Sequence, residues 1–161
     1  MLTRPQIDKL KCHSGLGWIT ALTNDAIRQL VAKDDLQLSL LDEKNLTEIT
    51  SADYPGERLM VCYNPLLAEE RERKRKELLE ATEKQLARID GQVERRTSKP
   101  LSAGEIGLKV GRILGRHKMA KHFHLTINDG AFSWSRNEES IQKEARLDGI
   151  YVIRTSEPAE R

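Results

Sequence analysis

The spacing of hydrophobic positions changes along the chain, and each spacing predicts a different kind of element. Near the N-terminus it predicts a helix that begins after Thr3, a short buried strand over residues 17–22 and an amphipathic helix over residues 24–33. Thr3 and Gln6 have the spacing of a capping box, which supports the first helix. The order helix, strand, helix is typical of an α/β sheet that the chain enters partway through.

The second region, residues 36–63, carries three short runs with the character of strands: LQLSLL, NLTEIT and RLMVCYN. The last two runs are separated by a segment that contains Tyr-Pro-Gly-Glu at residues 54–57. This order places Pro and Gly where a type II turn requires them. We therefore expect antiparallel strands in this region.

A long, highly charged helical pattern begins at Pro65. Acidic and basic residues four apart, such as Glu70 and Lys74, stabilise such a helix by roughly 0.2–0.5 kcal/mol a pair. One face carries a seam for a partner helix: Leu79, Thr82, Leu86, Ile89 and Val93. Ser102 and Glu105 form a second capping box and start the partner, which Gly115 would end. We expect a helical hairpin over residues 65–115.

The last part of the chain, residues 122–155, predicts a β-hairpin, a helix and a strand. Asn-Asp-Gly at residues 128–130 supplies the positive φ angles that tight hairpin turns need. Asn137 is placed to cap the helix that follows. The closing strand runs from Gly149 to Thr155.

Composition adds little support for any one function. The 161 residues are 38% hydrophobic, 4% aromatic and 32% charged, and 27 basic against 25 acidic side chains give a formal net charge of +2. Any nucleic-acid surface must therefore come from local clustering. Cys12 and Cys62 lie too far apart to indicate a disulfide framework or a zinc site, so we expect a reducing, cytoplasmic location. No apolar run approaches the roughly 18 residues that would predict a membrane span.

One stretch, residues 109–122, is rich in basic side chains and contains no acidic one. Its candidate DNA-binding residues are Lys109, Arg112, Arg116, Lys118 and Lys121. A stripe of this kind can neutralise several phosphates of a nucleic-acid backbone. The same spacing also fits a solvated helix face, and it does not decide between the two interpretations.

The common enzyme motifs are missing from the sequence: there is no Gly-rich phosphate loop, Gly-x-Ser-x-Gly elbow or His-Glu-x-x-His helix. His117, His122 and His124 cluster, and the last two form a candidate metal pair on one face of a strand. Because no third ligand lies nearby, an exposed polar face of a hairpin is the favoured interpretation. Turns and helix caps account for nearly all the candidate acids. We therefore expect no metal site.

Two long segments make the chain recognisable: residues 53–86, DYPGERLMVCYNPLLAEERERKRKELLEATEKQL, and residues 111–156, from GRILGRHKMAKHF to DGIYVIRTS. Together they resemble the bacterial insertion-sequence transposases with a DDE catalytic triad, in the superfamily typified by insertion sequence four. The strand WITAL near the start is similar to that family too. The resemblance covers almost the whole chain, and the order of its segments is more specific than any single motif.

The resemblance implies a ribonuclease-H-like α/β core with a large insertion, and Mg²⁺-dependent cleavage and joining of DNA at transposon ends by three acids that hold two metal ions. In the family, the two aspartates precede segments similar to the start of this chain, and the glutamate follows a segment similar to DGIYVIRTS. A near match to the family's Tyr-x-x-Arg-x-x-x-Glu signature, Tyr151 and Arg154, has Pro158 at the Glu position and lies on an expected strand, so we reject it. We expect none of the three acids in this chain and no cofactor bound to it, Mg²⁺ belonging to the intact family.

We therefore expect an α+β chain that is an internal part of such a transposase, with residues 1–34 from the catalytic core and residues 35–161 from the insertion region. The first hypothesis is a role in DNA transposition, with transposon-end DNA as partner and no cleavage by this chain alone. The alternative is a non-catalytic module that binds DNA, associates with itself or pairs with full-length transposase through the helical hairpin. A third interpretation is a marginally folded remnant, with residues 18–22 uncovered and the closing strand without part of its sheet.

Overall fold

The structure is a computed structural model, and it describes residues 1–41 and 45–159. The chain divides into two compact units. Unit 1 consists of Met1–Ala68 together with Gly149–Arg161, and unit 2 consists of Glu69–Asp148. These bounds differ from the division expected at residue 34: the strands at Leu46–Ile49, Arg58–Tyr63 and Ile150–Thr155 share one sheet with the N-terminal strand.

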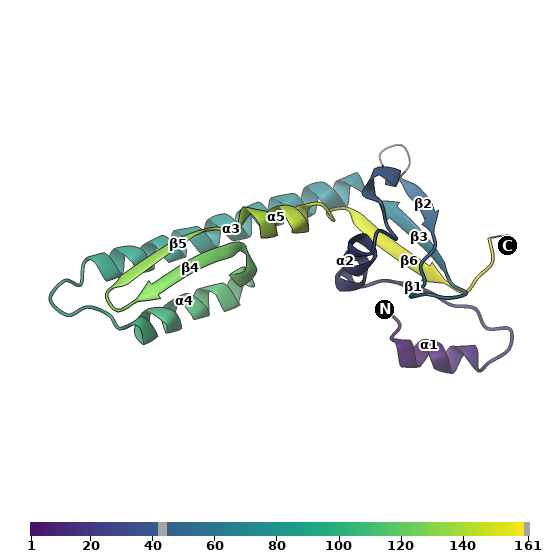
Figure 1. The fold of residues 1–161 in the computed structure, drawn as a ribbon, viewed down its shortest axis with the longest axis horizontal. Coiled ribbons are helices and arrows are strands. Elements are labelled where there is room, and N and C mark those ends of the chain that lie inside the picture. Colours follow the sequence, from purple (N-terminus) through teal and green to yellow (C-terminus); the bar gives the residue numbers. More distant parts are fainter. Residues whose placement is uncertain (42–44, 160–161) are drawn as a thin grey trace. The chain divides into compact units, whose positions relative to one another are not determined.

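Unit 1 is built around a four-stranded antiparallel sheet with the order β1-β6-β3-β2 (Figure 1). Its elements are α1 (Arg4–Lys11), β1 (Ile19–Ala21), α2 (Asn24–Ala32), the 3₁₀ helix η1 (Leu38–Leu41), β2 (Leu46–Ile49), β3 (Arg58–Tyr63) and β6 (Ile150–Thr155). The fold is therefore mixed α and β, as expected.

The closing strand β6 has a partner on each side. Thr155 pairs with Ile19 of β1 and also with Arg58 of β3. The closing strand, expected to lack part of its sheet, thus has a neighbour on both sides. The expectation of an uncovered segment at residues 18–22 was wrong. Trp18, Thr20 and Leu22 are buried, while Ile19 of the edge strand is 66% exposed. The alternation of a strand accounts for this pattern, since only one face meets the core.

The run LQLSLL does not form the expected strand. Leu38–Leu41 is a short 3₁₀ helix that ends at the buried Leu41. In the turn before it, Asp34 has a positive φ of 62°. Local turn geometry therefore replaces the strand that the alternating leucines predicted, and Leu40 stays 45% exposed. The part of the predicted strand region at residues 42–44 lies outside the described residues.

The turn between β2 and β3 is confirmed as predicted. Gly56 has a φ of 72°, and the backbone N–H of Glu57 donates to the Tyr54 carbonyl at 3.2 Å. This geometry matches a type II turn, in which the third residue needs a positive φ.

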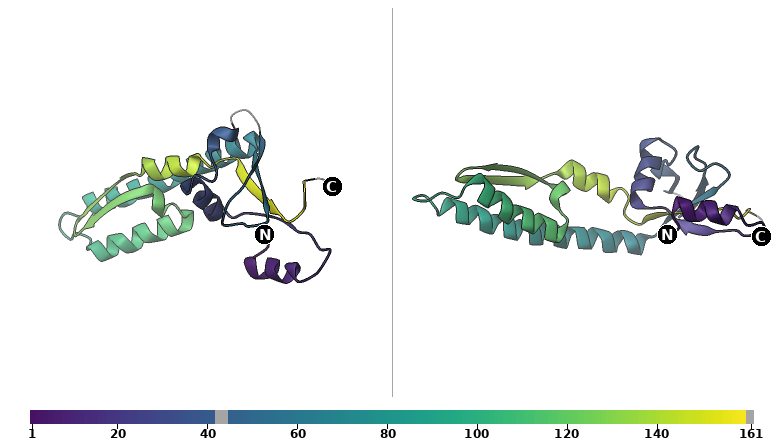
Figure 2. Two further views of the ribbon diagram at one scale, coloured as in Figure 1. Left: turned by 45° about the vertical axis from the view of Figure 1, so that its right-hand side comes forward. Right: turned by 90° about the horizontal axis from the view of Figure 1, so that it is seen from below.

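The core of unit 2 is formed by helices α3 and α4 and a β-hairpin, which lies along one side of this helix pair (Figure 2). Its elements are α3 (Pro65–Glu94, which starts within unit 1), α4 (Ala103–His117), η2 (Ala120–His122), β4 (Phe123–Asn128), β5 (Ala131–Arg136) and α5 (Glu138–Ala145). All five predicted seam residues of α3 are buried. The apolar ones share a core with α4 and with Phe123 and Phe132 of the hairpin, which confirms the helical hairpin as a packing unit.

The helix caps follow the sequence closely. The Ser102 N–H donates to Glu105 Oε2 at 2.9 Å, and the Ser140 N–H donates to Asn137 Oδ1 at 3.0 Å. Each such cap contributes about 1 kcal/mol. Gly115, however, does not end α4, because the helix continues to His117 and closes at Lys118 in the left-handed region. Within the described residues, no helix is long and apolar enough to cross a membrane.

Candidate functional site

Three of the five predicted DNA-binding residues lie on one side of α4. Lys109, Arg112 and Arg116 are spaced by three and four residues, which keeps them within about 60° of one another around a helix. All three side chains are exposed. The buried face of the same helix is formed by Ile106, Val110 and Leu114. Core packing on one face therefore directs the three basic side chains toward solvent.

The other two predicted residues follow at the C-terminal end of α4. Lys118 is the C-cap with a φ of 54°, and its backbone N–H donates to the Leu114 carbonyl. Lys121 lies in η2 and forms an ion pair with Glu144. Among the described residues, no carboxylate pairs with Lys109, Arg112, Arg116 or Lys118. Their charges are available to a partner, whereas that of Lys121 is largely neutralised.

The basic run at residues 71–76 of α3 is different, because acidic residues of the same helix lie beside it. Lys74 pairs with Glu70, and Arg73 pairs with Glu77, each four residues away on the same helix. Such exposed pairs stabilise the helix slightly and leave little net charge. Within the part of the chain that the structure describes, unit 2 has further basic residues without a carboxylate partner, but residues 109–118 are distinguished by a sequence with no acidic residue.

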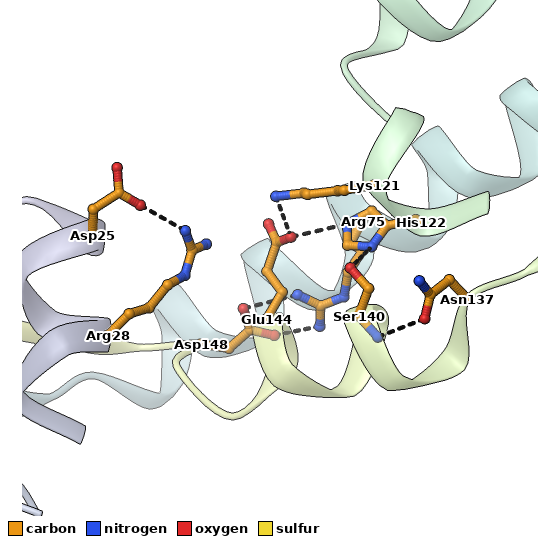
Figure 3. Close-up of polar contacts among 9 residues, drawn as sticks. All are labelled: Asp25, Arg28, Arg75, Lys121, His122, Asn137, Ser140, Glu144 and Asp148. Atoms are coloured by element: carbon orange, nitrogen blue, oxygen red, sulfur yellow. Dashed lines mark hydrogen bonds and ion pairs between the residues drawn. The ribbon is translucent and has the colours of Figure 1, made fainter. Parts of the chain in front are cut away.

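His122 is the centre of a polar cluster that sequence reasoning missed (Figure 3). We expected an exposed polar face at this position, but His122 lies in η2 and is fully buried, while His124 on β4 is exposed. His122 is buried because it lies in η2, before the strand begins, and η2 turns its side chain inward. The two histidines therefore do not form a pair on one strand face.

The His122 ring connects two elements of unit 2. Its Nε2 lies 2.8 Å from Glu144 Oε2, and its Nδ1 lies 3.2 Å from the hydroxyl of Ser140; both partners are on α5. The Nδ1 contact fits a neutral ring that accepts the Ser140 hydroxyl proton, while Nε2 lies at ion-pair distance from Glu144 without the geometry of a hydrogen bond. The ring therefore links η2 to α5.

The electrostatics of the cluster favour this neutral ring. Burial lowers the pKa of His122, and the opposing charge of Glu144 compensates only in part. Burial also opposes ionisation of Glu144, but its hydrogen bond and charge interaction with Lys121 outweigh that effect, so its pKa lies below the usual value. At neutral pH the cluster thus combines an uncharged imidazole with an ionised carboxylate.

A second ion pair closes the end of α5. Arg75 of α3 binds Asp148 through two hydrogen bonds, and both side chains are about nine-tenths buried. Arg71 donates to the Leu147 carbonyl at 3.2 Å. These contacts hold the segment that follows α5 against α3. Together with the His122 cluster they fix α5 within unit 2.

The contacts among Ser140, His122 and Glu144 are of the kind that activate a nucleophile. Two observations argue for a structural role instead. No part of His122 is exposed, and Glu144 also serves as the partner of Lys121. We therefore interpret the cluster as a buried connection between η2 and α5, which the sequence did not signal because Ser140 and Glu144 read as ordinary helix surface.

The donor set of the described residues does not suit the metal ions of the transposase family. No group of three or more His, Cys, Asp or Glu side chains within residues 1–41 and 45–159 is placed to hold a metal ion. Comparison of the chain with known protein families, curated proteins and solved structures finds no match.

Proposed function

We propose that this chain serves in DNA transposition, as a part of a DDE-type insertion-sequence transposase that contacts DNA without cutting it. The observation that carries the proposal is the ordered similarity of residues 53–86 and 111–156 to that family. No residue of the chain matches the family's three acids, so its own contribution is binding.

The organisation of the two units supports this proposal. In the sequence, unit 2 lies between strands β3 and β6. These two strands are direct antiparallel neighbours in the sheet of unit 1. A compact body inserted between paired strands is what an insertion within a larger core would look like. In this proposal the sheet of unit 1 belongs to the ribonuclease-H-like core, and the insertion is Glu69–Asp148.

The surface of α4 supports a role in DNA contact. Lys109, Arg112 and Arg116 form one exposed stripe, and Lys118 extends it past the end of the helix. Phosphate contacts by Lys and Arg supply most of non-specific DNA affinity. A helix whose opposite face is anchored in a core can present such a stripe at low entropic cost.

The pairing alternative receives less support. The seam of α3 that would meet a partner helix is already buried against α4 and the hairpin of the same unit. Pairing with a second transposase through this seam would require unit 2 to open. The DNA-contact version is therefore the one we favour.

The experiment is to incubate the purified chain with end-labelled duplex DNA, with and without Mg²⁺, and to measure both binding and strand cleavage. We expect binding that weakens with salt, no metal-dependent cleavage, and loss of binding when Arg112, Arg116, Lys118 and Lys121 are all neutralised. Cleavage that requires Mg²⁺, or the absence of any binding at low salt, would contradict the proposal.

A further inference from the structure

A polar cavity of about 590 Å³ opens in unit 1, in the size range of small-molecule sites. Four segments form its walls: helix α1, helix α2, the loop of residues 52–57 between β2 and β3, and strand β6 through Arg154. α1 contributes Arg4, Asp8 and Lys11 around the buried Ile7, a spacing that places all four on one helix face. The walls are therefore charged and converge from separate parts of the sequence.

Part of this lining is fixed by contacts within the protein. Arg154 binds Glu57 through two hydrogen bonds of 2.7 Å, and its guanidinium lies 4.8 Å from the ring centre of Tyr54 and 5.0 Å from that of Trp18. The Glu57 side chain is only 4% exposed. A bidentate pair stacked on aromatic rings is rigid, so this wall is formed before any ligand arrives.

A second pair closes the opposite wall. Lys33 of α2 binds Asp53 of the loop, and this hydrogen bond raises the pKa of Lys33. The pair is internally neutral. It joins α2 to the loop and leaves neither charge in need of a ligand.

The charges that remain unmatched all lie on α1. Lys11 approaches Glu57 at 3.4 Å, but Arg154 already occupies both oxygens of that carboxylate. Arg4 and Asp8 form no ion pair with any of the described residues. The cavity thus offers two cationic groups and one acceptor carboxylate along a single helix face, with an excess of one positive charge among its lining residues.

We propose that this cavity binds a nucleotide-like ligand, whose phosphate lies between Arg4 and Lys11 and whose hydroxyl or amino group donates to Asp8. Phosphate oxygens accept charge-assisted hydrogen bonds from both basic groups, and a carboxylate requires a donor. A phosphate alone would place its negative charge beside the Asp8 carboxylate and would give that carboxylate no hydrogen-bond donor. A nucleotide carries both an anion and several donors, and its size suits the cavity.

This site does not depend on the proposed DNA contact of unit 2, because all its lining residues belong to unit 1. Failure of one proposal therefore leaves the other standing. The phosphate could be supplied by a free nucleotide or by a nucleic-acid strand. Displacement of a bound mononucleotide by a single-stranded trinucleotide separates these two sources.

The test is a titration of the full chain with dAMP, deoxyadenosine and inorganic phosphate, followed by calorimetry and by backbone amide chemical shifts. We expect saturable 1:1 binding of dAMP, weaker binding of either component, and shifts confined to α1, α2 and residues 52–57. Arg4→Gln with Lys11→Gln should weaken dAMP binding about tenfold or more, since two charge-assisted hydrogen bonds are lost. Asp8→Asn should weaken binding of dAMP but not of phosphate.

The matched control is Lys9→Gln with Arg28→Gln, which removes the same charge from exposed residues of α1 and α2 outside the cavity. The control should bind dAMP as the unaltered chain does. Equal weakening in both double variants would mean diffuse charge attraction and would overturn the site. The site would also be overturned if the unaltered chain showed no saturable dAMP binding. The same holds if its amide chemical-shift changes were centred outside α1, α2 and residues 52–57.

Discussion

Tyr63 of β3 and Ile150 of β6 are cross-strand partners, although the whole of unit 2 lies between them in the sequence. The strands that precede and follow the inserted unit therefore pair with each other. Each unit has buried residues of its own, Leu59 and Val152 in unit 1 and Leu86 and Ile106 in unit 2.

This arrangement predicts that core damage stays local. Leu86→Ala removes a fully buried side chain from unit 2 and should cost about 2–5 kcal/mol of stability. Hydrogen exchange should accelerate in α3, α4 and the β4–β5 hairpin, while the amides of β3 and β6 keep their protection. Loss of protection in both units to the same extent would contradict two separate cores.

The Asp-Gly turn before β6 gives a second prediction. Gly149 has a φ of 75°, and a Cβ there would lie 2.6 Å from the carbonyl oxygen of Asn64, whose own N–H donates to Gly149. Gly149→Ala should therefore reduce the free energy of unfolding by about 2–3 kcal/mol. Gly91→Ala is the control, since nothing lies within 4 Å of a Cβ there, and this helical position should gain up to about 1 kcal/mol. Urea unfolding measures both, and equal effects of the two changes would refute this account of the turn.

The local elements were predictable from the sequence because their signals are local. The seam of α3 repeats on one helix face, and the Ser102 and Asn137 caps depend only on residues three positions away. The hairpin turn before Ala131 is specified by its own three residues, and Gly130 has the positive φ, 70°, that they predict.

The pairing of distant strands and the polar clusters were not predictable in this way. β6 reads as an apolar run, and nothing in it specifies that β1 and β3 are its neighbours. His122 gave no sign of burial, because its partners Ser140 and Glu144 lie on another element. The cavity between α1 and α2 likewise depends on tertiary packing alone.

Removal of one partner from the buried pair of Glu57 and Arg154 should strongly reduce the free energy of unfolding. Their side chains are 4% and 12% exposed, so Glu57→Gln leaves a desolvated guanidinium without its counter-charge. We expect a loss of about 3 kcal/mol in denaturant unfolding. Glu139→Gln breaks an exposed pair with Lys143 and should have little effect on unfolding, because solvent screens such pairs. A Glu57→Gln effect no larger than that of the control would show that the pair is solvated.

The buried His122 should make unit 2 sensitive to mild acid. Because its pKa in the folded chain lies below the ordinary value of about 6.5, the unfolded chain takes up a proton first as the pH falls. The stability it contributes is thus complete above about pH 6.5 and is lost as the pH falls toward the lowered pKa. The ring proton resonances of His122 in an NMR pH titration should give that pKa directly.

His122→Gln should flatten the pH dependence of unfolding below about pH 6.5, whereas the same change at the exposed His124 is the control for a histidine outside the cluster. A His122 pKa at or above 6.5 would contradict the burial argument. It would imply that Glu144 dominates and that the ring is charged in the folded protein.

The central claim, that the chain contacts DNA through the exposed basic stripe of α4, is tested most directly by fluorescence anisotropy of a labelled duplex across a range of salt concentrations. Arg112→Gln with Arg116→Gln should weaken binding and reduce the slope of log K against log salt by about 0.9 for each lost phosphate contact. The control, Arg73→Gln with Lys74→Gln, removes the same charge from exposed, ion-paired residues of α3 and should leave the slope unchanged. Equal slopes for the two double variants would contradict the claim.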